Sequence, residues 1–337
     1  MMQRKYLKWI LFLAVLFLLL IISVIVSLSS GEVKIAWTDL SEILSNKNSI
    51  EYAVLTKIRL PRLILAIAVG GGLSLSGAIL QGIYRNPLVE PYTLGISGGA
   101  ALGVAIAIVF GFQAVSYIAL PVFGFGGAIV TLFLVYFLST KKDGLSVSSM
   151  LLIGVMVSFV SSSAMMFLMS ITTTDNLQSI VFWVMGSLDE SNTMLIKIAI
   201  YSSLAGLLLT YFFAPSLNAL RLGETKARHL GINTKVTVKL LFFVASLLTG
   251  IAVSVAGVIG FVGLVIPHLM RLIIGNDYRI LIGSSFLGGA IFLIISDTVA
   301  RTIISPNELP IGVITGFVGG LVFIVVLSRT KSGFKLN

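Results

Sequence analysis

The most constraining feature of this sequence is a succession of apolar stretches, each close to the length of a membrane-spanning helix and separated by more polar connections. A helix needs about 20 mainly apolar residues to cross the hydrocarbon core of a bilayer. Ten such stretches lie at 7–28, 63–83, 93–110, 115–137, 149–171, 194–213, 236–255, 258–274, 280–299 and 311–327. The sequence therefore predicts an all-α integral membrane protein with about ten transmembrane helices.

The composition agrees with a membrane protein. Of the 337 residues, 57% are hydrophobic and only 11% are charged, and the mean hydropathy is +1.07, which is unusual for a water-soluble domain of this length. An additional apolar run at 179–188 is too short to span and predicts a re-entrant or interfacial helix. Because cysteine is absent, the chain has no disulfide or thiolate site. We treat 1–337 as a single transmembrane domain.

Basic residues are distributed unevenly between the two predicted membrane faces. With the N-terminus in the cytoplasm and ten spans, most of the 23 Lys and Arg residues fall inside and most of the 13 acidic residues fall outside. This is the positive-inside pattern of membrane proteins. It accounts for the net charge of +10 without a nucleic-acid partner. It predicts a multi-pass protein of the cell membrane, surrounded by lipid, with both termini in the cytoplasm.

The longest hydrophilic interruption in the second half of the chain is 215–235, PSLNALRLGETKARHLGINTK, which this orientation places in the cytoplasm. Helical spacing puts Leu222, Ala227 and Leu230 on one stripe, with charged side chains over the rest of the surface. The pattern predicts a short amphipathic helix between two spans. Such a helix is suited to contact with a partner outside the membrane.

Two boundary segments each allow two interpretations. Asn86 and Pro87 follow the second span at its inner end and favour a rigid turn, with a cytoplasmic gate as the alternative. At the outer boundary, Arg59, Arg62 and Arg301 run against the positive-inside trend. They would either reach toward headgroups with Asp297 or Glu308 as partners, or form a docking surface for an acidic protein.

The fifth predicted span carries hydroxyl and thioether side chains. Ser158, Ser161 and Ser162 share one helical face, close to Met165. Such hydroxyls can line a pore, but helix packing is the safer interpretation. His229 and His268 are the two histidines of the chain, and neither has a second ligand at metal-binding spacing. We assign no metal site.

Three classes of function are weighed. A permease driven by a separate ATPase needs a cytoplasmic contact segment and no ATP site, and the sequence has the segment and no GxxxxGKS/T loop. A proton- or sodium-driven carrier would hold ionisable residues deep in its spans, where this chain has almost none. A membrane enzyme needs a polar constellation, which the sequence also lacks. We assign no catalytic residue.

Six motifs, in order, carry a resemblance to a known family. They are GAILQGIYRNPLVEPYTLGISGGA at 77–100, WVMGSL from Trp183, LGETKARHLGI from Leu222, GVIGFVGLVIPHLMR at 257–271, SDTVAR from Ser296 and ELPIGVITG from Glu308. Together they resemble the FecCD family, the permeases of type II ABC importers for iron-siderophores, haem and cobalamin. The similarity covers nearly the whole chain.

The resemblance implies the partners. A second permease subunit, identical or paralogous, would complete a central path. Two ATP-binding subunits would carry ATP and Mg²⁺, so that this chain needs no cofactor, and an extracytoplasmic binding protein would deliver the ligand. Because no cluster in the sequence could strip a metal from its chelator, we expect an intact complex to cross. Ferric siderophore is preferred because iron uptake is the most frequent role in the family; haem, cobalamin and, less favoured, an ion-coupled carrier are the alternatives.

The resemblance also implies roles for individual residues. The segment that contacts the ATPase corresponds to Leu222, Gly223, Glu224, Ala227, Arg228, Leu230 and Gly231. The arginines that pair with glutamates of the binding protein correspond to Arg59, Arg62 and Arg301. The cytoplasmic gate corresponds to Asn86, Leu88, Ser146 and Ser148. The pathway lining corresponds to Ser158, Ser161, Ser162 and Met165.

Overall fold

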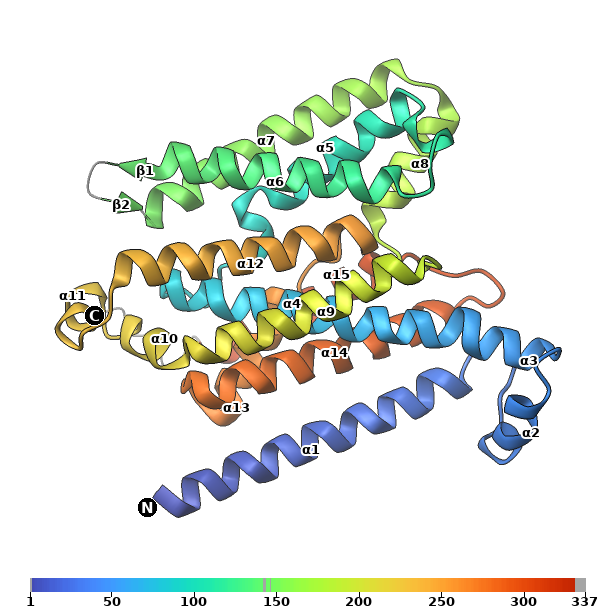
Figure 1. Cartoon of the computed structure of the whole chain (residues 1–337), viewed down its shortest axis with the longest axis horizontal. Coiled ribbons are helices and arrows are strands. Elements are labelled where there is room, and N and C mark those ends of the chain that lie inside the picture. Colours follow the sequence, from blue (N-terminus) through green and yellow to red (C-terminus); the bar gives the residue numbers. More distant parts are fainter. Residues whose placement is uncertain (1, 142–143, 146, 331–337) are drawn as a thin grey trace.

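The computed structural model describes residues 2–141, 144–145 and 147–330 as a bundle of helices (Figure 1). Seven helices of the described chain are long and apolar enough to cross a membrane, and α4 does so as part of a continuous helix over Ile50–Tyr84. The long helices are α1 (Met2–Ser29), α4 (Leu60–Tyr84), α6 (Ala119–Ser139), α7 (Val147–Ile171), α9 (Thr193–Phe212), α12 (Thr234–Ala256) and α14 (Tyr278–Thr302).

Three shorter apolar helices complete the ten predicted positions. They are α5 (Ile96–Val109), α13 (Val262–Ile274) and α15 (Ile311–Thr330). The connections contain η1 (Trp37–Asp39), α2 (Leu40–Ser45), α3 (Ile50–Ala53), η2 (Val54–Arg59), η3 (Pro91–Leu94), η4 (Phe112–Ala114), α8 (Thr174–Met185), α10 (Ala214–Leu220), α11 (Glu224–His229) and the antiparallel pair β1 (Thr140–Lys141) and β2 (Gly144–Leu145). The all-α class is confirmed, and every predicted span contains a helix.

Several helix boundaries differ from the sequence prediction. The second span was expected from residue 63, but its helix is continuous from Ile50 through the π-helical turn η2. The eighth was expected from residue 258, but α13 begins only at Val262, because Gly257 and Phe261 take positive φ angles of 70° and 68°. Of the short run expected at 179–188, residues 179–185 form the end of the twelve-residue helix α8, and residues 186–188 lie beyond it.

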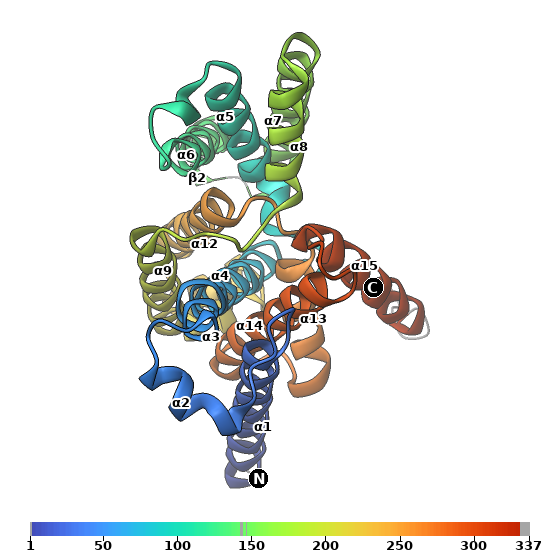
Figure 2. The same ribbon diagram turned by 90° about the vertical axis from the view of Figure 1, so that its right-hand side faces the viewer.

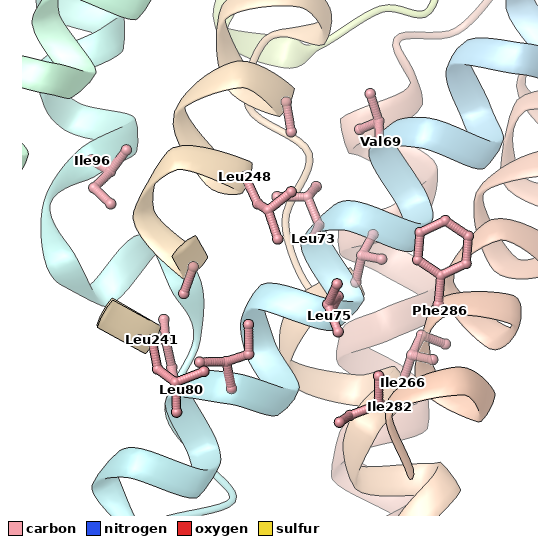
Figure 3. Close-up of a cluster of buried hydrophobic side chains, with 14 of the residues drawn as sticks. Val69, Leu73, Leu75, Leu80, Ile96, Leu241, Leu248, Ile266, Ile282 and Phe286 are labelled. Carbon is pink, nitrogen blue, oxygen red and sulfur yellow. The ribbon is translucent and has the colours of Figure 1, made fainter. Parts of the chain in front are cut away.

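The helix α4 forms the centre of the bundle. Of its apolar stretch, 89% is buried inside the chain, against 17% for α1 and 11% for α7. Viewed from one end, α4 lies among α9, α12, α13 and α14, with α5 to α8 on one side and α1 on the other (Figure 2). Aliphatic side chains of α4 meet Leu241 and Leu248 of α12 and Phe286 of α14 in the core (Figure 3). Because the middle of α4 is packed among apolar side chains, we expect charged functional groups at its two ends.

Glycines allow α4 to approach its neighbours at backbone distance. A Cβ atom on Gly70 would lie 2.4 Å from the carbonyl oxygen of Gly289 in α14. On Gly77 it would lie 1.8 Å from the carbonyl oxygen of Gly263 in α13. Small residues at such crossings are typical of membrane helices, where close packing replaces the hydrophobic effect as the force between helices.

Candidate functional site

The predicted coupling segment consists of α10, α11 and the link between them, at the same end of the bundle as the start of α1 (Figure 1). Helix α11 begins at Glu224 because Gly223 has a φ of +103°, in the region that favours glycine. Ala227 is fully buried. Arg228 pairs with Glu224 at 3.4 Å and donates from Nε to the Thr234 hydroxyl at 3.0 Å. The helix is thus fixed on the bundle through Ala227 and Arg228.

The single apolar stripe predicted for this segment is wrong. Leu222 precedes the helix and Leu230 ends it, because Gly223 and Gly231 both take positive φ angles and limit α11 to six residues. Only Ala227 faces the core. Leu222 and Leu230 are instead 57% and 62% exposed, so that two large apolar side chains flank a short charged helix.

A hollow of 540 Å³ joins the predicted gate to this segment. Asn86, after α4, and Ser148, in the first turn of α7, both line it, and so does Glu224 of α11. Leu88 is exposed and is absent from the lining; its backbone N–H donates to Oδ1 of Asn86 at 2.9 Å and closes a tight turn. Ser146 lies outside the described residues. The structure thus brings together one residue from each of three predicted elements.

Sequence reasoning missed other residues of this hollow. Tyr84, Arg85 and Leu151 also line it. Arg85 directly precedes Asn86 in the sequence, and this adjacency was the available signal.

At the opposite end of the bundle, two of the three outer arginines pair with acidic groups of the chain itself. Arg301 donates from Nε to Asp297 at 2.9 Å, and Arg62 contacts Asp297 at 3.4 Å and Glu308 at 2.8 Å. Asp297 is only 3% exposed. This matches the alternative in which Asp297 and Glu308 are the partners, while docking stays a prediction.

The third outer arginine binds backbone rather than acid. The guanidinium of Arg59 donates to the carbonyl oxygens of Leu28, at 2.5 Å, and Val33. Arg301 also donates to the carbonyl and hydroxyl of Ser27. Cations near the last carbonyls of a helix are favourable because they compensate the helix dipole. The two arginines therefore attach the C-terminal end of α1 to the bundle.

The serines of the fifth span mainly serve helix packing. Ser158 and Ser161 of α7 lie against Gly98 of α5, and Met165 packs in a cluster with Ile180 of α8. Ser162 is half-buried. Large apolar side chains are also exposed on α7: Leu152, Met156, Phe159, Val160, Met166, Phe167 and Ile171. A lining role for the serines and Met165 remains a prediction.

The model of the FecCD transport family matches residues 19–329 of this sequence. The chain belongs to the FecCD transport family. Its relatives include the hemin transport system permease protein HmuU of Yersinia pestis, 36% identical over 95% of this chain and 96% of that protein. The vitamin B12 import system permease protein BtuC of Klebsiella pneumoniae is 36% identical over 98% of this chain and 96% of that protein.

A solved structure gives the same fold for this FecCD family member. An inward-facing metal-chelate type ABC transporter superposes with a TM-score of 0.82 at 34% identity, covering 95% of this chain and 99% of that one. The family, the relatives and the fold agree that this is a multi-pass membrane permease of the type II ABC importers.

Proposed function

We propose that this chain is the permease subunit of an ATP-driven importer that moves an intact ferric siderophore from an extracytoplasmic binding protein into the cytoplasm. The observation that carries the proposal is the 540 Å³ hollow lined by Asn86, Ser148 and Glu224. Glu224 of α11 faces the first turn of α7 and the turn after α4 across it, so that a displacement of α11 alters the space beside both. A coupling segment beside a gate is what a permease driven by an external motor requires.

The contact with an ATP-binding subunit is supported by the exposed leucines. Leu222 and Leu230 lie on the end of the bundle that carries the basic N-terminal residues, which the positive-inside rule places in the cytoplasm. Apolar side chains exposed among charges favour contact with a protein surface. Glu224 and Arg228 between them supply a polar rim.

A second permease subunit is supported by the faces of α7 and α15. Phe159 and Phe167 of α7 are 65% and 63% exposed, and Phe317 of α15 is 70% exposed. The two helices border the same side of the bundle (Figure 2). A partner placed there would enclose a path between two copies, and the methionines of α7 would give it an adaptable wall.

The assignment of the cargo has less support than the assignment of the transporter class. The hemin and vitamin B12 permeases are each 36% identical to this chain, so identity does not distinguish their cargos. Within the described residues no group of three or more His, Asp or Glu side chains could hold a metal ion, which is compatible with passage of a closed chelate. Ferric siderophore is preferred because it is the most frequent cargo of the family, with haem and cobalamin as alternatives.

Uptake in a strain that lacks this gene tests the proposal. We expect the unaltered gene to restore uptake of a doubly labelled ferric siderophore, iron and chelator together, but not of haem or cobalamin. Leu222→Asp and Leu230→Asp should each reduce uptake about tenfold or more, because each removes one apolar contact with the ATPase subunit, at about 1.5 kcal/mol or more. Both side chains are exposed, so the variants should still insert and fold.

Leu44→Asp is the matched control, since Leu44 is 49% exposed on α2 at the opposite end of the bundle. It should retain an ATPase subunit on purification, whereas the two other variants should lose it. Unchanged uptake by both coupling variants would contradict the role of α11. If the gene restores uptake of haem or cobalamin and not of the siderophore, the proposed cargo is wrong. If iron enters without its chelator, passage of an intact complex is refuted.

Docking of the binding protein at Arg59, Arg62 and Arg301 would require these guanidiniums to exchange internal acceptors for carboxylates of the partner. Arg59 is the best candidate because its acceptors are neutral carbonyls. We expect Arg59→Glu to weaken binding-protein affinity by about 2 kcal/mol or more, as for a desolvated charge pair. Lys57→Glu, an exposed change two residues away, should alter mainly the salt dependence.

The measurement is titration of the binding protein onto the reconstituted permease, with elution volume as the check on folding. The reverse pattern, loss with Lys57→Glu and none with a folded Arg59→Glu, would move the docking surface from the arginines to the exposed lysines of this end.

A further inference from the structure

Three arginines converge on a cavity at the end of the bundle that carries α11. The cavity has a volume of 190 Å³ and is lined by Gln81, Arg85, Pro87, Arg221, Arg271, Asn276 and Tyr278. Arg85 follows the last residue of α4, Arg221 follows α10, and Arg271 lies in the last turn of α13. Three helices that are far apart in sequence therefore end around one small space.

None of the three guanidiniums is neutralised by a carboxylate of the described chain. Arg271 donates to Oε1 of Gln81 and to the hydroxyl of Tyr278 at 3.1 Å. Arg221 donates to the carbonyl oxygen of Asn276 at 2.6 Å. The side chain of Arg85 makes no hydrogen bond or ion pair with any described residue, while its backbone N–H donates to the carbonyl oxygen of Gly82 at 3.4 Å. By contrast, Arg62, Arg228 and Arg301 each pair with an acidic side chain.

The two nearest acidic residues are engaged elsewhere. Glu224 pairs with Arg228. Asp277 accepts from Asn218 at 2.9 Å and from Lys5 at 3.1 Å. Burial acts to raise the pKa of Asp277, but these hydrogen bonds, the Arg279 backbone N–H and the Lys5 charge outweigh it and hold that pKa below its ordinary value. Both carboxylates are thus engaged with partners away from the cavity.

Helix dipoles do not balance the positive charge. The C-terminal end of a helix carries about half a negative charge, so that three such ends supply about −1.5 against +3 from the arginines. An excess of about one to two positive charges remains, in a space walled by buried groups. Gln81 and Tyr278 are 3% and 1% exposed.

The cavity is held in shape before any ligand arrives. Gln81 donates from Nε2 to the carbonyl oxygens of Gly263 and Leu264 at 3.2 Å each, while its Oε1 holds Arg271. Tyr278 donates to the carbonyl oxygen of Ala78 at 3.3 Å. The backbone of Arg85 is left-handed, with φ of +52°, a conformation that non-glycine residues rarely adopt, and it sets the direction in which the side chain leaves the chain.

We propose that this cavity binds a phosphate group. Planar guanidiniums match the oxygen pairs of phosphate, and three of them with free N–H groups can surround one tetrahedral anion. A volume of 190 Å³ admits one phosphate and a few waters but is below the roughly 300 Å³ at which pockets for larger organic ligands begin. The group is therefore either inorganic phosphate or the phosphate of a lipid headgroup.

The cavity lies beside the gate hollow, so a bound anion would affect the contact between α11 and the bundle. Arg85 also lines the gate hollow, and its Nη1 lies 3.5 Å from the place that a Cβ on Gly223 would take, in the link to α11. A phosphate bridging Arg85, Arg221 and Arg271 ties the ends of α4, α10 and α13 to one another. Anion binding would stiffen the region through which α11 meets the bundle.

The test uses the purified full-length permease, first in neutral detergent with inorganic phosphate, and then in nanodiscs of phosphatidylcholine with or without phosphatidylglycerol. Binding is followed by calorimetry and by native mass spectrometry. We expect one saturable site, weakened about tenfold by Arg85→Gln and again by Arg221→Gln, as for loss of a charged hydrogen bond. Arg279→Gln, an exposed arginine on α14 outside the cavity, is the matched control and should bind as the unaltered protein does.

Arg85→Gln breaks no side-chain hydrogen bond or ion pair with a described residue, so that its folding, checked by elution volume, should be unchanged. Binding of inorganic phosphate that is lost in Arg85→Gln supports the proposal with a soluble anion. Retention of phosphatidylglycerol alone, lost in the same variant, supports it with a lipid headgroup. Equal binding by all variants, or anion binding that appears only when an ATPase subunit is added, would overturn it.

Discussion

Replacing Asp297 with alanine is expected to lower the free energy of unfolding by about 3–5 kcal/mol, the usual cost of leaving buried charges without their partner. Asp297 is the carboxylate shared by Arg62 and Arg301, whose side chains are 8% and 6% exposed. Without it, Arg301 loses its acidic partner, and Arg62 keeps only Glu308, which is 47% exposed. The midpoint of thermal aggregation in detergent, with the monodisperse fraction on size exclusion, measures the loss.

Glu224→Ala is the matched control, because Glu224 and Arg228 have the same four-residue spacing as Asp297 and Arg301 but are about half exposed. An exposed pair at this spacing contributes about 0.3–0.5 kcal/mol. Similar small losses in both variants would show that the buried pair is screened by water and that α14 does not depend on it.

Adding one methyl group at Gly77 or Gly289 is expected to destabilise the fold by about 3 kcal/mol, the upper part of the range for overpacking. The added carbon would meet the carbonyl of Gly263 at 1.8 Å, or that of Gly70 at 2.2 Å, and these are backbone atoms of neighbouring helices that no side-chain rotation can move. The helices α13 or α14 would have to move away from α4. Yield of folded protein and thermal midpoint are the readouts.

Gly126→Ala in α6 provides the comparison, since nothing lies within 4 Å of its added carbon. Alanine should there leave stability unchanged or raise it by up to about 1 kcal/mol, the helix-propensity difference. Folded protein at normal yield from Gly77→Ala would mean that the α4–α13 crossing tolerates separation, and the close approach would then not be what holds α4.

The spans could be predicted from the sequence because burial in lipid leaves long apolar runs with polar ends. Their boundaries could not, wherever local backbone conformation decides them. Phe261 carries no sequence mark of its positive φ, yet it delays the start of α13. Likewise, Gly223 and Gly231 looked like ordinary members of an amphipathic pattern, but their positive φ angles limit α11 and leave Leu222 and Leu230 exposed.

The sequence was enough to identify several candidate site residues, but not to predict most of the contacts that they make. The three outer arginines were found because their charge is unusual on that face, and two of their partners were named beforehand as alternatives. The attachment of Arg59 to the end of α1 could not be foreseen, because backbone carbonyls have no signature in a sequence. The gate hollow depends on α4, α7 and α11 meeting, which only the packed structure reveals.

The continuous helix from Ile50 to Tyr84 contains 35 residues, which at 1.5 Å per residue is about 52 Å, well beyond the roughly 30 Å of hydrocarbon. One piece of secondary structure therefore reaches from the outer arginines to the turn at Asn86. Because its middle is packed against α9, α12, α13 and α14 and its ends lie at the two membrane faces, this single helix joins both faces without an intervening loop. Its α-helical geometry is interrupted at the π-helical turn Val54–Arg59, a kind of turn that is frequent at functional sites.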